Sequence, residues 1–177
     1  EARFGNLDLW VNNAGIIEPM VPLRDIASAD FLRHVEINLG GVFHGTRAFV
    51  RHLHRTGNGG VLINLSSGAA WQGYAGWAPY CASKAGVERL TETVQLEEQA
   101  AGLRAHAVAP GVVDTGMQDL IRACPPERFP MVERFREMKR AESFNTIPFV
   151  ALHILSIAFD PECLPEQVAV RLPQENG

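Results

Sequence analysis

Val61-Leu62-Ile63-Asn64-Leu65-Ser66-Ser67 is the stretch on which the predicted fold depends, a short apolar run that ends in two serines. A run of this length and composition is typical of a strand buried on both faces of a parallel sheet. A long helical pattern follows it at about 80–101. The alternation recurs along the chain, with further strands expected at 7–11, 103–109 and 167–172 and further helices at 30–53 and 147–159. It predicts a doubly wound parallel sheet, with helices on both faces in three α/β/α layers.

Two features interrupt this regular pattern. The Gly40-Gly41 pair is a weak spot inside the helical pattern of residues 30–53. The stretch 114–145 is charged and contains three prolines, which predicts one or two short helices in a mobile insert.

The composition fits one domain that binds a small molecule. The 177 residues are 46% hydrophobic, enough to bury a core, and no repeat or linker divides residues 1–177. A formal net charge of −4 argues against a surface for nucleic acid or an anionic membrane. No apolar run approaches the roughly 18–20 residues of a membrane span. The chain begins Glu1-Ala2-Arg3-Phe4-Gly5, without an initiator Met or signal peptide, so we expect a piece of a longer protein.

Cysteine and histidine usage narrows the expected location and chemistry. Cys81, Cys124 and Cys163 are odd in number and widely spaced, which predicts a reducing, cytoplasmic compartment and no disulfide framework. The six histidines form neither H-E-x-x-H nor a Cys/His cluster, so no metal site is expected.

Small and polar residues follow three of the expected strands. They are Asn12-Asn13-Ala14-Gly15, Ser66-Ser67 and Pro110–Thr115. Ligands of open parallel sheets bind outside the carboxyl ends of the strands, so these turns are candidates for one binding site. Each turn taken alone is also compatible with an ordinary strand-to-helix connection.

Tyr80 and Lys84 add an acid–base pair to these turns. They lie four residues apart on the helix after Ser67, so both side chains project from one helix face. A nearby ammonium favours the ionised form of a phenol, which lets Tyr80 act as the acid–base group. Ser67, at a strand end 13 residues earlier, is placed to hydrogen-bond an oxygen whose charge changes. A lone Tyr-x-x-x-Lys is often structural, so the pair gains weight only from its neighbours.

The motifs together resemble those of the short-chain dehydrogenases/reductases, in order and in spacing. The residues that carry the resemblance are Asn12-Asn13-Ala14-Gly15, Asn38, Ser67, Tyr80–Gly86 and Pro110-Gly111. Gly76–Cys81, Leu96–Glu98 and Ala109–Gln118 further resemble the sepiapterin reductase and benzil reductase branch. The resemblance covers nearly the whole chain. It implies a Rossmann-like fold that lacks its first β-α-β-α unit, so that residues 1–177 form the carboxyl-terminal part of one domain.

The family resemblance also implies roles for individual residues. Tyr80 donates the proton in reduction, and Lys84 lowers the pKa of Tyr80 and holds the nicotinamide ribose. Ser67 polarises the substrate carbonyl, while Asn38 orders a helix break and a water that leads to Lys84. The residues implied in cofactor binding are Asn12, Ala14, Gly15, Tyr80, Lys84, Pro110, Gly111, Val113 and Thr115. Asn12 is equally compatible with a role in tying strands together, and Asn13 is expected to be mainly scaffold.

Substrate contacts are less specific in the sequence. Trp77 and Met117 are candidates, and Met117, Phe129, Met131 and Phe135 form either an apolar lid or ordinary packing. The sepiapterin enzymes hold the pterin with an Asp in the last strand, whereas the comparable place here holds Arg171, which argues against a pterin. Four arginines are compatible either with an acidic group of a ligand or with solvent: Arg122, Arg128, Arg134 and Arg171.

The expected activity is hydride transfer that reduces a small ketone or diketone to an alcohol. NADPH is expected over NAD from the branch resemblance alone, because the residues that choose between them precede Glu1. A homodimer or homotetramer is expected through helices 30–55 and 80–101. The alternative is a truncated, non-catalytic module for binding or dimerisation. A sugar-nucleotide epimerase is disfavoured, because the chain lacks a long substrate domain.

Overall fold

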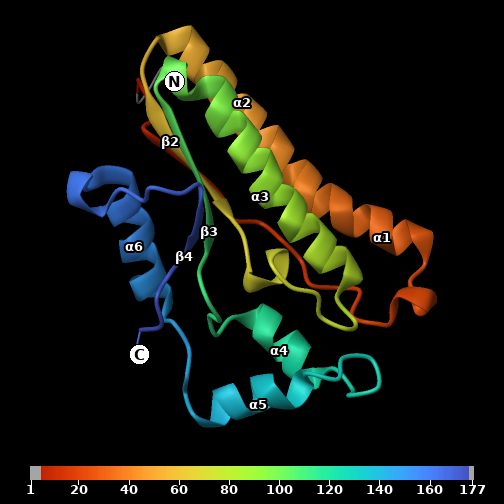
Figure 1. The fold of residues 1–177 in the computed structure, drawn as a ribbon. Helices are drawn as coiled ribbons and strands as arrows, with labels where there is room; N and C mark the ends of the chain where they lie inside the picture. Colours follow the sequence, from red (N-terminus) through yellow and green to blue (C-terminus); the bar gives the residue numbers. More distant parts are fainter. Residues whose placement is uncertain (1–4, 176–177) are drawn as a thin grey trace.

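A computed structural model describes residues 5–175 as a parallel sheet flanked by helices (Figure 1). The four strands are β1 (Leu9–Asn12), β2 (Gly60–Leu65), β3 (Leu103–Ala109) and β4 (Ala169–Arg171). They lie in the order β1-β2-β3-β4, and every neighbouring pair is parallel. This confirms the predicted α/β fold of Rossmann type. The expectation that the chain is a piece of a longer protein was drawn from its start at Glu1, and Glu1 lies outside the described residues.

Six α-helices connect and extend these strands. Their bounds are α1 (Ser28–Val35), α2 (Gly41–Thr56), α3 (Ala78–Glu98), α4 (Gly116–Ala123), α5 (Val132–Arg140) and α6 (Ile147–Phe159). The insert after β3 therefore contains the two short helices expected of it. Within residues 5–175, no helix combines the length and the apolar character that a membrane crossing requires.

Alternating side chains of β2 build a core on each face of the sheet. Val61, Ile63 and Leu65 pack with Ile157 and Ala158 of α6. Side chains of α2 and α3 cover the opposite face around Leu62, and they are Phe49, Leu53 and Val94. Figure 1 shows α6 on one side of the sheet and α2 and α3 on the other. Because successive side chains of a strand point to opposite faces, one apolar run supports both layers.

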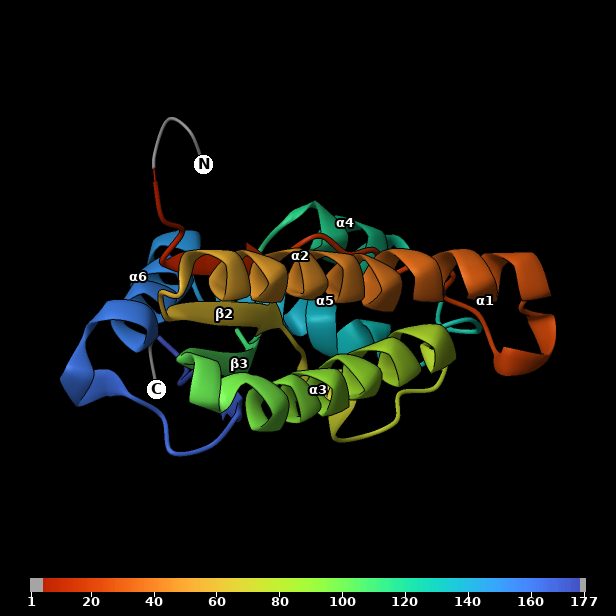
Figure 2. The ribbon, with the colours of Figure 1, turned by 90° about the horizontal axis from the view of Figure 1, so that it is seen from above.

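The helix before β2 has a local distortion where the sequence predicts a weak spot. Residues Glu36–Gly40 form a π-helical turn between α1 and α2. Gly40 and Gly41 keep right-handed helical backbone angles, so the helix continues instead of breaking. Figure 2 shows α1 and α2 as one continuous rod. The π turn has a wider hydrogen-bond spacing, and such turns are frequent at functional sites. Here it carries Asn38, which is 1% exposed.

A chain of polar side chains crosses the sheet at the ends of β1 and β2. Asn12 Nδ2 donates to Asn64 Oδ1 at 2.8 Å, and Asn64 Nδ2 donates to Thr91 Oγ1 of α3 at 2.9 Å. Asn12 Oδ1 accepts from Trp10 Nε1 at 2.9 Å. Gly45 of α2 packs directly against this amide, because a Cβ at Gly45 would stand 2.0 Å from Asn12 Oδ1. The side chain of Asn12 is thus part of the scaffold that joins β1, β2, α2 and α3.

The close approach of α2 to Asn12 gives a stability test with a control in the same helix. Alanine normally stabilises a helix interior relative to glycine by up to about 1 kcal/mol. At Gly45 the added methyl group displaces Asn12, so Gly45→Ala should destabilise the protein by about 1–3 kcal/mol. Gly41→Ala has nothing within 4 Å of the new methyl and should stabilise it. Urea unfolding measures both, and a stable Gly45→Ala variant would contradict the described packing.

Candidate active site

The three turns singled out in the sequence line one cavity at the carboxyl ends of the strands. Its volume is about 1010 Å³, at the upper end of the usual range of roughly 300–1,000 Å³ for small-molecule sites. Gly15 lies on its wall after β1, Ser66–Gly68 after β2, and Pro110–Val113 after β3. The predicted meeting of these turns at one edge of the sheet is therefore observed.

Tyr80 and Lys84 lie side by side on the first turns of α3 and both line the cavity. Lys84 Nζ donates to the carbonyl oxygen of Leu65, the last residue of β2, at 2.7 Å. The same nitrogen lies 5.6 Å from the centroid of the Tyr80 ring. The side chains are 8% and 6% exposed respectively, so the pair is largely removed from water.

Burial dominates the ionisation of this pair. It raises the pKa of Tyr80, an effect that a hydrogen bond with Ser67 opposes. Burial also lowers the pKa of Lys84 to about 8. At neutral pH, Tyr80 is therefore a neutral phenol beside a charged ammonium. A neutral phenol can donate a proton, and the ammonium favours the phenolate that remains.

The two serines after β2 point to different partners. Ser67 caps the short 3-10 helix of Gly68–Ala70 by accepting from the Ala69 amide at 3.2 Å, and it hydrogen-bonds Tyr80. Ser66 Oγ instead donates to the buried Glu88 Oε1 at 2.6 Å. Ser67, and not Ser66, is consequently the serine that shares its surroundings with the phenol.

Asn38 holds the segment after β1 against α1 and α2. Its Oδ1 accepts from the Ile16 amide at 2.8 Å, and its Nδ2 donates to the Ile16 carbonyl at 2.8 Å. Its Nδ2 also lies 2.9 Å from His34 Nε2, which therefore accepts, leaving His34 Nδ1 to donate to the Glu18 carbonyl at 2.6 Å. Burial lowers the pKa of His34, with a smaller lowering from the charge of Lys84. A neutral His34 is consistent with this hydrogen-bond pattern.

Sequence reasoning missed His34 as a member of this cluster. The ring is fully buried and makes an edge contact with the Tyr80 ring at 6.1 Å between centroids. Its spacing of four residues before Asn38 was the available signal, because that spacing places both residues on one helix face.

The residues of the turn after β1 differ in how close they lie to the cavity. A Cβ at Gly15 would stand 3.4 Å from Asn38 Oδ1 and 4.0 Å from Lys84 Nζ, so the absent side chain leaves the lysine open to the cavity. Asn13 lines the cavity, whereas the amide of Asn12 lies within the scaffold described above. Ala14 is exposed. Asn13, expected to be mainly scaffold, is thus nearer to the cavity than Asn12.

Asn145, which sequence reasoning missed, fixes the turn after β3. Its Nδ2 donates to the Pro110 carbonyl at 2.8 Å and to the Pro173 carbonyl at 3.0 Å, and its backbone amide donates to Val112 O at 2.9 Å. Gly111 lies against it with φ of +76°, a conformation that favours glycine. Val113 and Thr115 continue this wall of the cavity. Residues 35 positions apart are thereby joined, which no local spacing indicates.

Aromatic packing supports the part of the cavity wall that Trp77 and Phe135 line. Trp77 stacks on Phe129 with 4.5 Å between centroids, and Phe135 contacts both rings. Phe129 and Phe135 are buried, which supports packing over a lid for these two residues, and Met117 and Met131 pack against the same cluster. Trp77 Nε1 and Gln118 Oε1 are buried on this wall without a hydrogen-bond partner in the described part of the chain.

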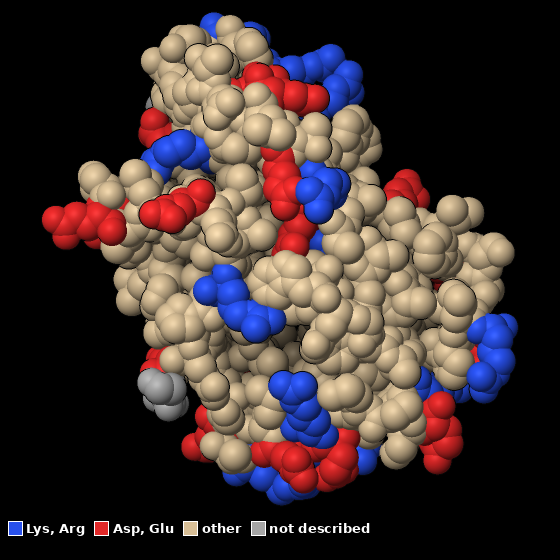
Figure 3. All heavy atoms as spheres, viewed as in Figure 1, with Lys and Arg blue, Asp and Glu red and all other residues tan. Residues whose placement is uncertain are grey.

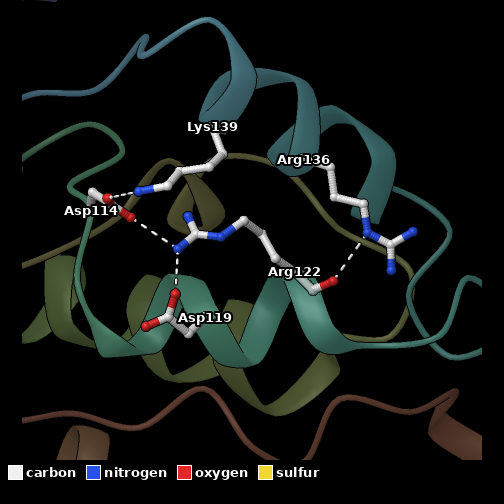
Figure 4. A network of polar contacts seen from close by, with 5 residues as sticks. All are labelled: Asp114, Asp119, Arg122, Arg136 and Lys139. Atoms are coloured by element: carbon white, nitrogen blue, oxygen red, sulfur yellow. Dashed lines mark hydrogen bonds and ion pairs between the residues drawn. The ribbon is translucent and has the colours of Figure 1, made fainter.

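An ionic network fastens α4 to α5 (Figure 4), and both helices contribute residues to the cavity wall. Arg122 of α4 donates to Asp114 Oδ1 at 3.0 Å and to Asp119 Oδ1 at 2.6 Å. Lys139 of α5 hydrogen-bonds the other oxygen of Asp114, and this bond leads the lowering of the pKa of Asp114. Arg136 Nε donates to the Arg122 carbonyl at 3.0 Å. Asp114 therefore joins the end of the β3 turn to both helices.

Comparison with known proteins places this arrangement in a family. The family model described as short chain dehydrogenase matches residues 1–125. The chain belongs to the short chain dehydrogenase family. The benzil reductase ((S)-benzoin forming) of Bacillus cereus is 35% identical over 166 residues, covering 93% of this chain and 66% of that relative. The cis-4-hydroxycyclohexanecarboxylate dehydrogenase of Sinomonas cyclohexanicum is 38% identical over 146 residues, covering 80% and 58% respectively.

Solved structures of similar proteins share the fold of this chain. The KRED1-Pglu enzyme superposes with a TM-score of 0.84 at 28% identity, covering 97% of this chain and 70% of that one. Levodione reductase superposes with a TM-score of 0.82 at 27% identity, covering 98% and 67%. This short chain dehydrogenase family member thus spans about two thirds or less of the length of the curated relatives above. Within residues 5–175, no group of three His, Cys, Asp or Glu side chains is placed to hold a metal ion.

The lowered pKa of Lys84 predicts how stability depends on pH. Below about pH 8, Lys84 is charged in both the folded and the unfolded state, and the folded state bears the full cost of burying the charge. Between about 8 and 10.5 the unfolded chain retains a proton that the folded chain has lost, so stability rises with pH, by roughly 3 kcal/mol in all. Lys84→Met should remove this rise. Lys139→Met, which replaces the chain's other lysine, should retain it, and urea unfolding across this range measures the difference.

The network around Asp114 predicts local, salt-sensitive ordering of α5. Asp114→Asn removes the charge that pairs with Arg122 and Lys139, and exposed pairs of this kind are worth up to about 1 kcal/mol. Amide hydrogen exchange in α5 should become faster, by up to about fivefold, and more so at low salt than at high salt. Glu92→Gln, which breaks the exposed Arg89–Glu92 pair on α3, should leave α5 unchanged. Unchanged exchange in Asp114→Asn would refute this role.

Proposed function

We propose that this chain carries the hydride-transfer residues of an NADPH-dependent carbonyl reductase, with residues 1–177 forming the carboxyl-terminal part of a single Rossmann-type domain. The observation that carries the proposal is the convergence of Ser67, Tyr80 and Lys84 on one cavity wall. Relatives named as reductases and dehydrogenases support the reaction class.

The proposed reaction divides the work among three side chains. When bound, the nicotinamide supplies a hydride to the carbonyl carbon. Tyr80 donates its phenolic proton to the carbonyl oxygen as that oxygen gains charge. Ser67 hydrogen-bonds the same oxygen, and the Lys84 ammonium stabilises the phenolate that Tyr80 becomes. The carbonyl oxygen stays on its carbon and becomes the hydroxyl group of the product alcohol. Tyr80 is reprotonated from solvent, for which we propose a water path past Asn38 and Lys84.

We propose that the cavity wall at the strand ends would hold the dinucleotide cofactor. Gly15 leaves Lys84 accessible, and Gly111, with its positive φ, lets the β3 turn pack against Asn145. We propose that the residues in contact with the cofactor are Gly15, Tyr80, Lys84, Pro110, Gly111, Val113 and Thr115, with Asn12 and Ala14 shaping the tip of β1. The preference for NADPH is supported by the benzil reductase resemblance.

A small ketone or diketone is the proposed substrate. One relative reduces benzil to (S)-benzoin, according to its name. One similar structure is named as a levodione reductase. Trp77 and Met117 line the cavity beside Tyr80 and would contact the substrate body. Trp77 and Tyr80 lie 5.5 Å apart between ring centroids, so the indole limits the space beside the reacting carbonyl.

A homodimer or homotetramer is proposed through the long helices. Leu32 of α1, Phe43 of α2 and Leu96 of α3 are exposed at 65%, 45% and 72%, and Leu39, Phe43 and Leu90 line an apolar groove between α2 and α3. The same surface supports the second candidate, a module that dimerises without catalysis. The free thiols Cys81, Cys124 and Cys163 are compatible with a cytoplasmic location, which we also propose.

Replacement of Tyr80 tests the reductase proposal. Tyr80→Phe removes the proton donor while retaining the ring, so turnover of benzil with NADPH should fall at least about 100-fold, with NADPH affinity nearly unchanged. Tyr74→Phe, which removes the chain's other phenol from the same cavity, should lose less than about tenfold. Absorbance at the NADPH band measures turnover, and fluorescence titration measures binding.

The outcomes separate the two candidates. Substantial turnover by Tyr80→Phe would exclude the proposed proton donor. A wild-type chain that dimerises but neither binds NADPH nor reduces benzil would favour the dimerisation module instead.

A further inference from the structure

The charged side chains that line the cavity are all cations. They are Lys84, Arg134 and Arg171, and no Asp or Glu is among the described residues on its wall. The whole chain, in contrast, has 20 acidic residues against 16 Lys and Arg. Figure 3 shows Lys or Arg side chains on two sides of the hollow in the middle of this face. The cavity therefore has the opposite charge to the protein as a whole.

Arg171 lies next to the proposed reaction centre. Its guanidinium carbon is 4.6 Å from the centroid of the Trp71 ring. Its Nη2 stands 3.4 Å from a Cβ built on Gly68, the residue after Ser67. The stacked indole orients a guanidinium whose charge has no carboxylate partner in the part of the chain that the structure describes.

Arg134 is the unpaired cation of a helix whose other cations are paired. On α5, Arg136 and Arg140 pair with Glu133, and Lys139 pairs with Asp114. Arg134 has no such pair among residues 5–175, and it lines the cavity beside Phe135. Both Arg134 and Arg171 are exposed, so they stand at the rim of the cavity and not in its buried wall.

We propose that Arg171 and Arg134 select a carbonyl substrate that also bears a carboxylate, that is, an oxo acid or the corresponding hydroxy acid. The inference rests on the proposed reductase function. Ser67 and Tyr80 receive the carbonyl oxygen, and the adjacent Arg171 receives the carboxylate through its planar fork of donors. Arg134 contributes a second positive charge at the rim. A neutral substrate of the same shape lacks both attractions.

Phosphate groups of the cofactor are the other anions that the two arginines could meet. Arg171 is placed beside Gly68 and Trp71, after Ser67, whereas the proposed cofactor contacts lie at Gly15 and along Pro110–Thr115. The backbone of Arg171 pairs with Ala109, next to Pro110, but its side chain lies beside Gly68 and Trp71. This placement of the guanidinium favours the substrate as the anion. The experiment below includes NADPH as a separate ligand to distinguish the two sources.

A matched pair of ligands tests the inference on the 177-residue chain. 4-Oxocyclohexanecarboxylate and 4-oxocyclohexanecarboxamide differ in charge and hardly in shape. Calorimetric titration should show tighter binding of the acid, by about five- to tenfold at low salt, with a smaller preference at high salt. Arg171→Gln and Arg134→Gln should each reduce the preference, and the double variant should abolish it. Arg140→Gln, on the same helix as Arg134, should leave it unchanged.

Three results would overturn the inference. They are equal affinities for acid and amide, a preference that survives the double variant, and failure of both ligands to bind. A double variant that loses NADPH affinity while its preference for the acid persists would assign the arginines to the cofactor. Reduction of benzil by wild-type protein in any of these cases would leave the proposed reductase function standing, so the two proposals can fail separately.

Discussion

The burial of the Lys84 ammonium is the constraint on which the site depends. An ammonium removed from water is costly unless its donors find acceptors. One acceptor is the carbonyl oxygen of Leu65, the last residue of β2, at 2.7 Å. The bond ties the beginning of α3 to the end of the central strand. The remaining donors of Lys84 face Gly15 and the cavity, where a ligand with hydroxyl groups can accept them.

The position of Lys84 depends in turn on the segments around it. Gly15 can approach the lysine only because Asn38 clamps Ile16 through both its amide and its carbonyl. Asn38 reaches inward from the π turn, and His34, one helical turn earlier, accepts from its Nδ2. An aspartate at Asn38 would lack the donor for Ile16 O and His34 and would place a second charge near Lys84. The amide satisfies both neighbours without charge, so the lysine remains the charged member of the cluster.

The sequence predicts the elements that are determined locally. β3 at Leu103–Ala109 and α6 at Ile147–Phe159 match the predicted ranges. Gly102 and Pro110 bound β3, while the N-cap Thr146 and Pro148 mark the start of α6. β1 begins two residues later than predicted, at Leu9, because the register with β2 begins there. Helix spacing and a strand end predict that Tyr80, Lys84 and Ser67 lie together, and the structure brings all three to one cavity. Asn145 was missed because its partners Pro110 and Pro173 are distant in sequence, and only the folded chain brings them together.

The cavity walls differ in how much freedom they leave to a ligand. Trp77, Phe129 and Phe135 are packed as core, so this wall is rigid, and its shape limits the size of what can bind. Trp77 Nε1 and Gln118 Oε1 are buried there without hydrogen-bond partners among residues 5–175, and an unpaired buried polar atom costs about 1–3 kcal/mol. The exposed arginines at the rim bear no such cost, because water solvates them until a ligand arrives. Discrimination by shape therefore belongs to the inner wall, and discrimination by charge belongs to the rim.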